Sequence, residues 1–284
     1  MATQLWGKVF FKDQFAGYIR EEPGDCITFT YDSDYISAGN PAIAHGLPVR
    51  ETPYHSYHGL HPFFDNLVSE GWLEQAQSRC IGDRNTSRFK LLLAFGVDCA
   101  GAVSVIDPEP VTRVTTIDPS DTKEHAVLIS RASLSGVQPK LAIIKEAGQY
   151  RPTGRDELST HIAKFPSATH PTILETEYLT TTAFNTLIPD DAVVSMHIDR
   201  IKGIENTDAL LIERFDRQVI QLKRDSKAPC NAPIKSSKTT IHRIHFEEFN
   251  QLLKRRSKEK YNGAYNDMAT FISEEKPCLP VQNY

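Results

Sequence analysis

The stretch Ser133–Lys140, Ser-Leu-Ser-Gly-Val-Gln-Pro-Lys, decides how the second half of this chain is interpreted. Gly136 stands among small serines, and the apolar segment 141–144 follows, so the pattern predicts a flexible loop that leads into a strand. Such a loop allows backbone amides to approach phosphates. It is neither a Gly-x-Gly-x-x-Gly motif nor a Walker A loop, and taken alone a Ser/Gly turn is usually only a turn.

Two residues downstream fit the same chemistry. Lys164 ends a β-like segment, 158–164, and Glu177 lies in the next segment, 175–187, whose apolar residues have helical spacing. In a kinase, a strand lysine paired with a helix glutamate holds the α- and β-phosphates. For any such pair considered alone, two unrelated surface charges are the commoner arrangement. The order along the chain is what favours the kinase interpretation.

The charged stretch Glu213–Arg217 follows the apolar run 209–212. In a kinase, this part of the chain links the two lobes and offers main-chain groups to adenine. The alternative is a strand end with a solvated charge cluster. The segments 197–200 and 206–208 contain acids and an amide of the catalytic-loop type, but they precede this linker, so we expect the ends of a hairpin that turns at Gly203.

The sequence predicts an α+β fold. Residues 1–45 alternate in the manner of strands, a helix is expected to start at His61, another over 85–96 ends at its glycine, and 101–105 returns to strand. The predicted divisions are a β-rich N-terminal subdomain, a linker, a kinase-like lobe of antiparallel sheet plus helix, a basic insertion and the start of a helical lobe, over residues 1–106, 107–124, 125–217, 218–241 and 242–284.

Composition excludes several classes of protein. No apolar run is long enough to cross a bilayer, and the N-terminus does not resemble a signal peptide, so a cytoplasmic protein without a membrane partner is expected. The five cysteines are far apart, which favours reduced thiols. His55, His58 and His61 are spaced by three, but no neighbouring carboxylate or cysteine completes a site, so no metal is predicted there.

Charge is unevenly distributed. The chain has a formal net charge of −4, yet residues 218–260 contain eleven Lys/Arg and only four Asp/Glu. A basic block on an acidic body can serve an acidic partner. The favoured interpretation is a solvated, partly disordered insertion, because residues 223–240 are rich in Lys, Ser, Pro and Thr.

Taken together, the ordered motifs resemble the HipA family, bacterial serine/threonine kinases that act as toxins in type II toxin–antitoxin modules. The resemblance covers almost the whole chain and rests on the motifs already described and on four further stretches, which are Trp6-Gly7, 63–71, 92–103 and 243–249. It implies autophosphorylation of the Ser/Gly loop and binding of ATP with Mg²⁺. The residues implied are Ser133 and Ser135 for autophosphorylation, and Gly136, Val137, Gln138, Lys140, Lys164, Glu177, Glu213 and Phe215 for the nucleotide.

The resemblance is incomplete beyond the linker. The family continues with a catalytic loop of the type Asn-Thr-Asp-x-His-x-Lys-Asn and a metal-binding Asp, and neither follows Arg217 in this sequence. Phosphoryl transfer depends on such groups, so no catalytic residue or metal ligand is assigned after the linker, and no efficient kinase activity is expected from the chain alone. The alternative to an incomplete kinase is a pseudokinase-like accessory protein.

The resemblance also implies partners. They are a HipB-like antitoxin or a complementary kinase chain, and a protein substrate such as an aminoacyl-tRNA synthetase, with DNA contacted only indirectly. Without a complete helical lobe, an apolar surface is expected around residues 244–272, where Phe246, Phe249, Leu252, Leu253 and Phe271 have less to pack against.

Overall fold

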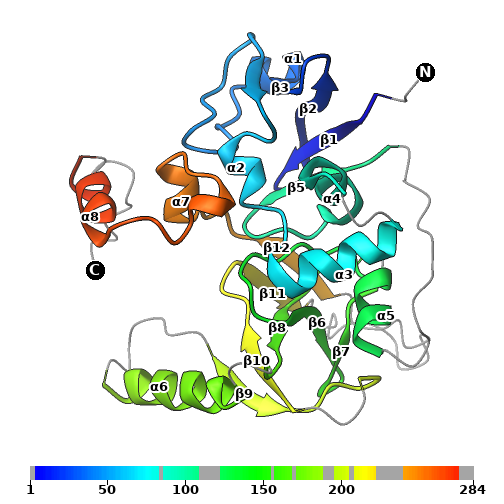
Figure 1. The fold of residues 1–284 in the computed structure, drawn as a ribbon, viewed down its shortest axis with the longest axis vertical. Coiled ribbons are helices and arrows are strands. Elements are labelled where there is room, and N and C mark those ends of the chain that lie inside the picture. Colours follow the sequence, from blue (N-terminus) through cyan, green and yellow to red (C-terminus); the bar gives the residue numbers. More distant parts are fainter. Residues whose placement is uncertain are drawn as a thin grey trace, which may run out of the picture.

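The computed structural model describes residues 4–82, 86–108, 122–154, 157–167, 171–187, 195–204, 208–221 and 239–274. The fold is mixed α/β, with two curled antiparallel sheets stacked along the long axis and helices packed around them (Figure 1). This arrangement confirms the predicted fold class. None of the helices in the described residues is long and apolar enough to cross a membrane.

The first sheet is formed by the N-terminal strands and has the order β4-β3-β2-β1-β5. Strands β1 (Trp6–Phe11) and β2 (Gln14–Glu22) are joined by Lys12 and Asp13, both with positive φ, which matches the right-handed twist of a tight hairpin. The other strands are β3 (Cys26–Tyr31), β4 (Tyr54–Tyr57) and β5 (Val103–Ile106). Their inner face packs on a core that includes Phe29, Phe64 and Phe95.

Four helices belong to this half of the chain, namely α1 (Ser33–Ser37), α2 (Pro62–Asp65), α3 (Gly71–Ile81) and α4 (Arg88–Phe95). Gly96 ends α4, as predicted. The helix expected to start at His61 is instead two helices, because α2 ends at Asp65 and the non-helical residues 66–70 precede Gly71, which has a φ of 59°. Gly71 touches the backbone of Val137, so this break brings the N-terminal half against the Ser/Gly loop.

The second sheet has the order β7-β6-β8-β10-β9, and all of its pairings are antiparallel. Its strands are β6 (Lys140–Glu146), β7 (Gln149–Pro152), β8 (His161–Lys164), β9 (Met196–Asp199) and β10 (Ala209–Glu213). Helix α6 (Ile173–Leu187) follows β8. Helix α5 (Thr122–Ile129) begins two residues before the predicted end of the linker and packs against α3. One continuous apolar core therefore runs through both halves.

The basic insertion differs from the prediction at both of its ends. β11 (Arg217–Gln221) and β12 (Thr239–Arg243) form an antiparallel pair, in which the β-branched residues Val219 and Ile220 lie opposite Ile241 and Thr240. The remainder of the predicted insertion, 222–238, lies outside the described residues. The two ends of the predicted insertion, 218–221 and 239–241, are thus strand residues, which the prediction of a partly disordered insertion did not include.

The C-terminal part contains α7 (Phe249–Leu252), a 3₁₀ turn over Ser257–Glu259 and α8 (Tyr265–Glu274). The helix predicted from Phe246 starts later, because Glu248 and Gln251 form a capping box. None of the ten residues of α8, all of them described, is fully buried. The predicted apolar surface is only partly present, since Phe246, Phe249 and Phe271 are half-buried in ring contacts while Tyr261 and Tyr265 are exposed.

Candidate functional site

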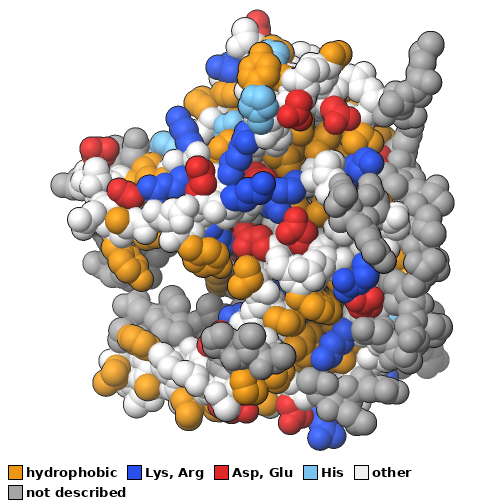
Figure 2. All heavy atoms as spheres, in the orientation of Figure 1, with side chains coloured by type: hydrophobic (Ala, Val, Ile, Leu, Met, Phe, Trp, Pro, Cys, Tyr) orange, Lys and Arg blue, Asp and Glu red, His pale blue; other side chains and the backbone are white. Residues whose placement is uncertain are grey.

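A pocket of about 800 Å³ lies between the second sheet and the C-terminal segment. Figure 2 shows the surface hollowed in this region, between the C-terminal helices and α6. The pocket has walls from the Ser/Gly loop, the second sheet, the stretch after β10 and the C-terminal segment. Its lining residues include Leu134, Ser135, Gly136, Val137, Gln138, Lys140, Ile162, Lys164, Glu213, Phe215, Phe246, Glu248 and Tyr261.

The Ser/Gly loop is folded around the side chain of Lys140. The Lys140 Nζ donates to the carbonyl oxygens of Ser135, at 2.8 Å, and Gly136, at 2.6 Å. Gly136 has a φ of 93°, a conformation that a glycine adopts without strain. Burial, together with the nearby positive charge of Lys164, lowers the pKa of Lys140 to about 8. The loop carbonyls thus enclose a lysine that can lose its charge at mildly alkaline pH.

Two carboxylates from distant parts of the chain hold the outside of the loop. Glu70, just before α3, accepts a hydrogen bond from the Gly136 amide at 3.2 Å, and Glu248 accepts one from the Ser135 hydroxyl at 2.6 Å. The Lys260 Nζ lies 2.8 Å from Glu248 Oε2 and 3.9 Å from Glu70 Oε1. Burial would lower the pKa of Lys260, but the two carboxylates outweigh it and raise this pKa. Lys260 therefore stays charged and joins both carboxylates to the loop.

The two candidate serines have different surroundings. Ser133 is 2% exposed, and its Oγ lies 3.0 Å from the Oγ of Ser69, which also accepts a hydrogen bond from the Leu134 amide. Ser135 is half-buried and lines the pocket. In this conformation of the loop, only Ser135 of the two presents its hydroxyl to the pocket.

The predicted lysine–glutamate pair is formed. Lys164 at the end of β8 lies on the pocket wall, and its Nζ lies 2.6 Å from Glu177 Oε2 on α6. Lys164 also pairs in register with both Leu210 of β10 and Lys140 of β6, so its backbone is fixed at the centre of the sheet. Strand and helix together place this cation beside the loop.

The stretch 213–217 forms the wall opposite the loop. Glu213 and Phe215 are exposed and line the pocket, and the ring of Phe215 lies 4.8 Å from that of Phe246. Arg214 and Asp216 alternate with them and are buried, as is Arg217. The alternative of a solvated charge cluster was therefore wrong for these three residues.

The hairpin predicted before this stretch is present. β9 and β10 are antiparallel, with Asp199 opposite Ala209 and His197 opposite Leu211, and Gly203 has a φ of 86°. Residues 205–207 lie outside the described part of the chain. His197 and Asp199 sit on a strand of the sheet, which agrees with their exclusion as catalytic-loop residues.

Four residues of this region were not predicted from the sequence, namely Glu70, Glu248, Lys260 and Asp98. The capping-box pattern at Glu248 marks a helix start, but it does not indicate that the carboxylate meets a loop more than a hundred residues away. Among the described residues, no group of three His, Cys, Asp or Glu side chains is arranged to hold a metal ion.

Comparison with known proteins identifies the family. Residues 7–106 match the HipA N-terminal domain, and residues 132–282 match the HipA-like C-terminal domain. These matches cover most of the chain, so the chain belongs to the HipA family. The resemblance inferred from the motifs is thereby confirmed.

Individual relatives agree with this assignment. A putative kinase, Y4mE of Sinorhizobium fredii, is 24% identical over 86% of this chain and 58% of its own length. The serine/threonine-protein kinase toxin HipA of Shewanella oneidensis is 26% identical over 69% of this chain and 46% of its own. An uncharacterized protein of Haemophilus influenzae is 34% identical over 35% of this chain. The chain thus spans about half the length of the two kinase relatives.

A solved structure shares the fold. The complex of HipA, HipB and operator DNA from Shewanella oneidensis matches with a TM-score of 0.54 at 21% identity. The match covers 84% of this chain and 54% of the other. At this identity, the likeness establishes the fold.

Proposed function

We propose that this chain binds ATP in the 800 Å³ pocket and forms the nucleotide-holding part of a HipA-type serine/threonine kinase toxin. The observation that carries the proposal is the Lys164–Glu177 pair, formed in one pocket with the Ser/Gly loop and the 213–217 stretch. Each feature alone is common. Their convergence on one pocket is what phosphate and adenine recognition require.

The residues of the pocket fit a nucleoside triphosphate. The volume lies within the range of about 300–1,000 Å³ for small-molecule sites. Lys140 and Lys164 supply positive charge at the loop end, where phosphates would be held, and Phe215 with Phe246 offers ring faces at the other wall. Gln138 contributes a buried side-chain amide nitrogen that has no hydrogen-bond partner in the described structure. Such a group is available to a ligand.

We include Mg²⁺ in the proposal because the resemblance to the HipA family implies it. Mg²⁺ is usually bound by one or two carboxylates together with substrate phosphates, so a preformed cluster of three side chains is not required. We propose Ser135 and Ser133 as autophosphorylation sites. In the observed conformation Ser135 has its proton directed at the Glu248 carboxylate, whereas Ser133 has to leave its contact with Ser69 first.

Calorimetric titration of the purified chain with ATP, with and without Mg²⁺, tests nucleotide binding. Saturable binding that Lys164→Met weakens supports the proposal, and no binding in either condition refutes it. Intact mass after incubation with Mg-ATP tests the transfer step. A gain of one phosphate that Ser133→Ala/Ser135→Ala loses shows a working kinase, and no gain in a chain that binds ATP identifies a pseudokinase or half of a kinase.

The second candidate function is that of an accessory protein, which binds a HipB-like antitoxin or a complementary kinase chain and contacts DNA only through it. The observation that favours it is helix α6, on which Leu179, Phe184 and Leu187 are exposed. Light scattering of the chain alone and mixed with a HipB-like repressor tests this function. For the kinase, an aminoacyl-tRNA synthetase is the proposed substrate by family, and radiolabel transfer to it is the corresponding assay.

A further inference from the structure

The side chains of residues 213–216 are alternately exposed at the pocket and buried in the protein. All four residues from Glu213 to Asp216 contribute atoms to the pocket wall, but Glu213 and Phe215 are exposed there, whereas Arg214 and Asp216 are only 4% and 3% exposed and bond to groups inside the protein. This alternation is the ordinary geometry of an extended chain. The pocket wall therefore has a reverse side, and whatever holds the buried side chains also sets the position of the exposed ones.

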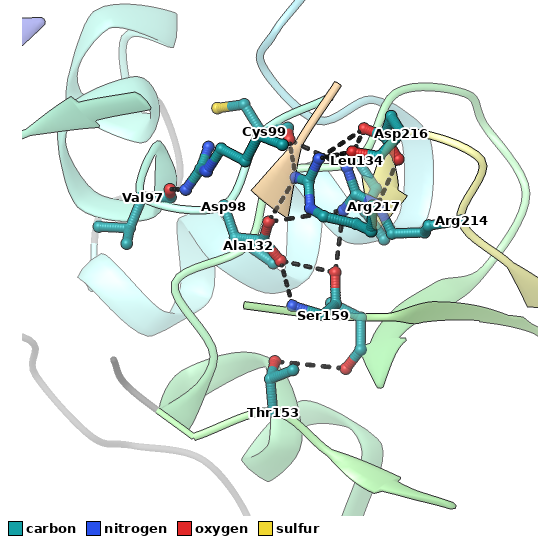
Figure 3. Close-up of polar contacts among 12 residues, drawn as sticks. Val97, Asp98, Cys99, Ala132, Leu134, Thr153, Ser159, Arg214, Asp216 and Arg217 are labelled. Atoms are coloured by element: carbon teal, nitrogen blue, oxygen red, sulfur yellow. Dashed lines mark hydrogen bonds and ion pairs between the residues drawn. The ribbon is translucent and has the colours of Figure 1, made fainter. Parts of the chain in front are cut away.

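The reverse side is held by the N-terminal half of the chain (Figure 3). Asp98, in the loop after α4, accepts from Arg217 at 2.7 Å through Oδ1. Its Oδ2 accepts from the amide and the hydroxyl of Ser159, at 2.9 and 2.6 Å. The same Ser159 hydroxyl accepts from Arg214 at 2.9 Å, and Arg214 Nη1 lies 3.6 Å from Asp98 Oδ1.

Asp216 closes the network from the other side. Its carboxylate accepts from Arg214 Nη2 at 2.6 Å and Arg217 Nη1 at 2.8 Å. It also accepts from the backbone amide of Gly101 at 2.8 Å. Both arginines in addition donate to the carbonyl of Cys99. Two carboxylates and two guanidinium groups thus tie the loop 98–101 to the reverse side of the pocket wall.

The network depends on charge. Burial alone would raise the pKa of Asp98, but the guanidinium groups of Arg214, Arg217 and Arg243 and the Ser159 hydroxyl lower it to about 2. Burial would likewise raise the pKa of Asp216, but Arg214, Arg217 and the Gly101 amide lower it. Removal of either carboxylate leaves two buried guanidinium groups that share one carboxylate, and the excess buried positive charge is strongly unfavourable. We therefore expect the arginine side chains to shift when Asp98 loses its charge.

We propose that Asp98 is a positioning residue of the nucleotide site, which fixes the pocket-facing wall at Glu213 and Phe215 by anchoring Arg214 and Arg217 from behind. The proposal rests on the function proposed above. It makes the N-terminal domain an obligatory part of the adenine-facing half of the site, although Asp98 does not line the pocket. Asp98 also contacts the segment that leads into the phosphate-facing half, but through its backbone: its carbonyl accepts from the Ser133 amide at 3.1 Å, and it forms a β-bridge with Ala132. Asp98→Asn keeps these backbone contacts and changes only the side chain.

The test compares two probes, each of which represents half of the ligand. Adenosine reports on the wall at 213–217, and inorganic tripolyphosphate reports on the loop and the two lysines. We expect Asp98→Asn to weaken adenosine binding at least about tenfold and to change tripolyphosphate binding by less than about twofold. Ser159→Ala, which keeps every charge, is expected to shift adenosine binding in the same direction by less. Phe29→Leu, in the first sheet, controls for a general loss of stability.

Hydrogen–deuterium exchange of the ligand-free protein supplies a second readout. Amides of 213–217 are expected to exchange faster in Asp98→Asn, while those of β6 stay protected. Unchanged exchange in this stretch, or equal loss of both probes, overturns the positioning role. If the wild-type chain binds neither probe, the proposed nucleotide function fails, and the exchange data alone then decide whether Asp98 fixes this wall.

Discussion

Lys164 and Glu177 are joined by an ion pair of 2.6 Å, although one ends a strand and the other lies on a helix. The pair fixes helix α6 to the sheet at the edge of the pocket. Its geometry determines where a positive charge is available to a ligand. Because the pair is partly exposed, its own contribution to stability is small, and its main consequence concerns binding.

Lys164→Met is expected to weaken ATP binding at least about tenfold, or about 1.4 kcal/mol, because one of two phosphate-facing cations is lost. Calorimetry provides the measurement. Lys145→Met, an exposed position on β6, is the matched control and should bind as the wild type does. Equal affinities for all three proteins would contradict the assignment of Lys164.

Gly71→Ala is expected to destabilise the protein and to displace the Ser/Gly loop. A Cβ at this position would lie 2.6 Å from the Val137 carbonyl oxygen and 2.7 Å from its Cα, in addition to the cost of a φ of 59°. Gly39→Ala is the control, because it has a similar φ of 69° and open space around it. Backbone strain costs each variant about 1–2 kcal/mol, so any greater loss in Gly71→Ala measures the clash.

The two variants should be compared by denaturant unfolding. If Gly71→Ala loses no more stability than Gly39→Ala, the close contact between the start of α3 and the loop is not maintained in solution.

Lys260→Met is expected to loosen the Ser/Gly loop. The substitution leaves Glu70 and Glu248 close to each other without the cation that now lies between them, and like charges repel. Faster amide exchange over 133–138, reduced by 0.5 M salt, is the expected result. Lys258→Met, a substitution at an exposed lysine of the same turn, should leave the exchange unchanged. Protection equal to that of the wild type would exclude Lys260 as a contributor to loop closure.

The low pKa of Lys140 predicts a pH dependence with a definite sign. Its pKa of about 8 lies below the ordinary lysine pKa of 10.5, so between these pH values the unfolded chain binds more protons than the folded one. Stability therefore rises with pH through this window, relative to Lys140→Met, and the folded state bears the full cost of the buried charge below pH 8. Tripolyphosphate affinity should fall over the same window, since the site loses a positive charge.

Unfolding and tripolyphosphate titrations at pH 7, 8, 9 and 10 provide the measurement for both proteins. A wild-type protein whose profile runs parallel to that of Lys140→Met throughout would show that Lys140 titrates in its ordinary range.

The part of the site that the sequence predicts comes from short segments with regular spacing. Lys164 and Glu177 could be found because one follows an alternating segment and the other lies on the next helical one. Glu70 and Glu248 could not, because they reach the loop from 66 and 113 positions away, and no local pattern encodes that contact. Such contacts depend on how the two halves pack together.

The buried arginines show a second reason why part of the site could not be predicted from the sequence. Arg214 and Arg217 resemble a solvated charge cluster in sequence, because charged residues are rarely buried unless they are paired. Their partner Asp98 lies 119 positions from Arg217, in the other half of the chain. The strand pair β11–β12 was missed because each strand is only five residues long and neither has alternating apolar residues, so the composition of the insertion dominated the interpretation.

Because Ser133 is buried, a phosphate on its side chain would report that the loop had opened earlier. A hydroxyl in contact with Ser69 and almost closed off from solvent cannot be reached by a phosphoryl donor while the loop keeps its present shape. A phosphate found on Ser133 is thus a record that the loop has been open, and one on Ser135 alone is not. The ratio of the two modified forms in protein isolated from cells would therefore measure how often this loop opens during the life of the molecule.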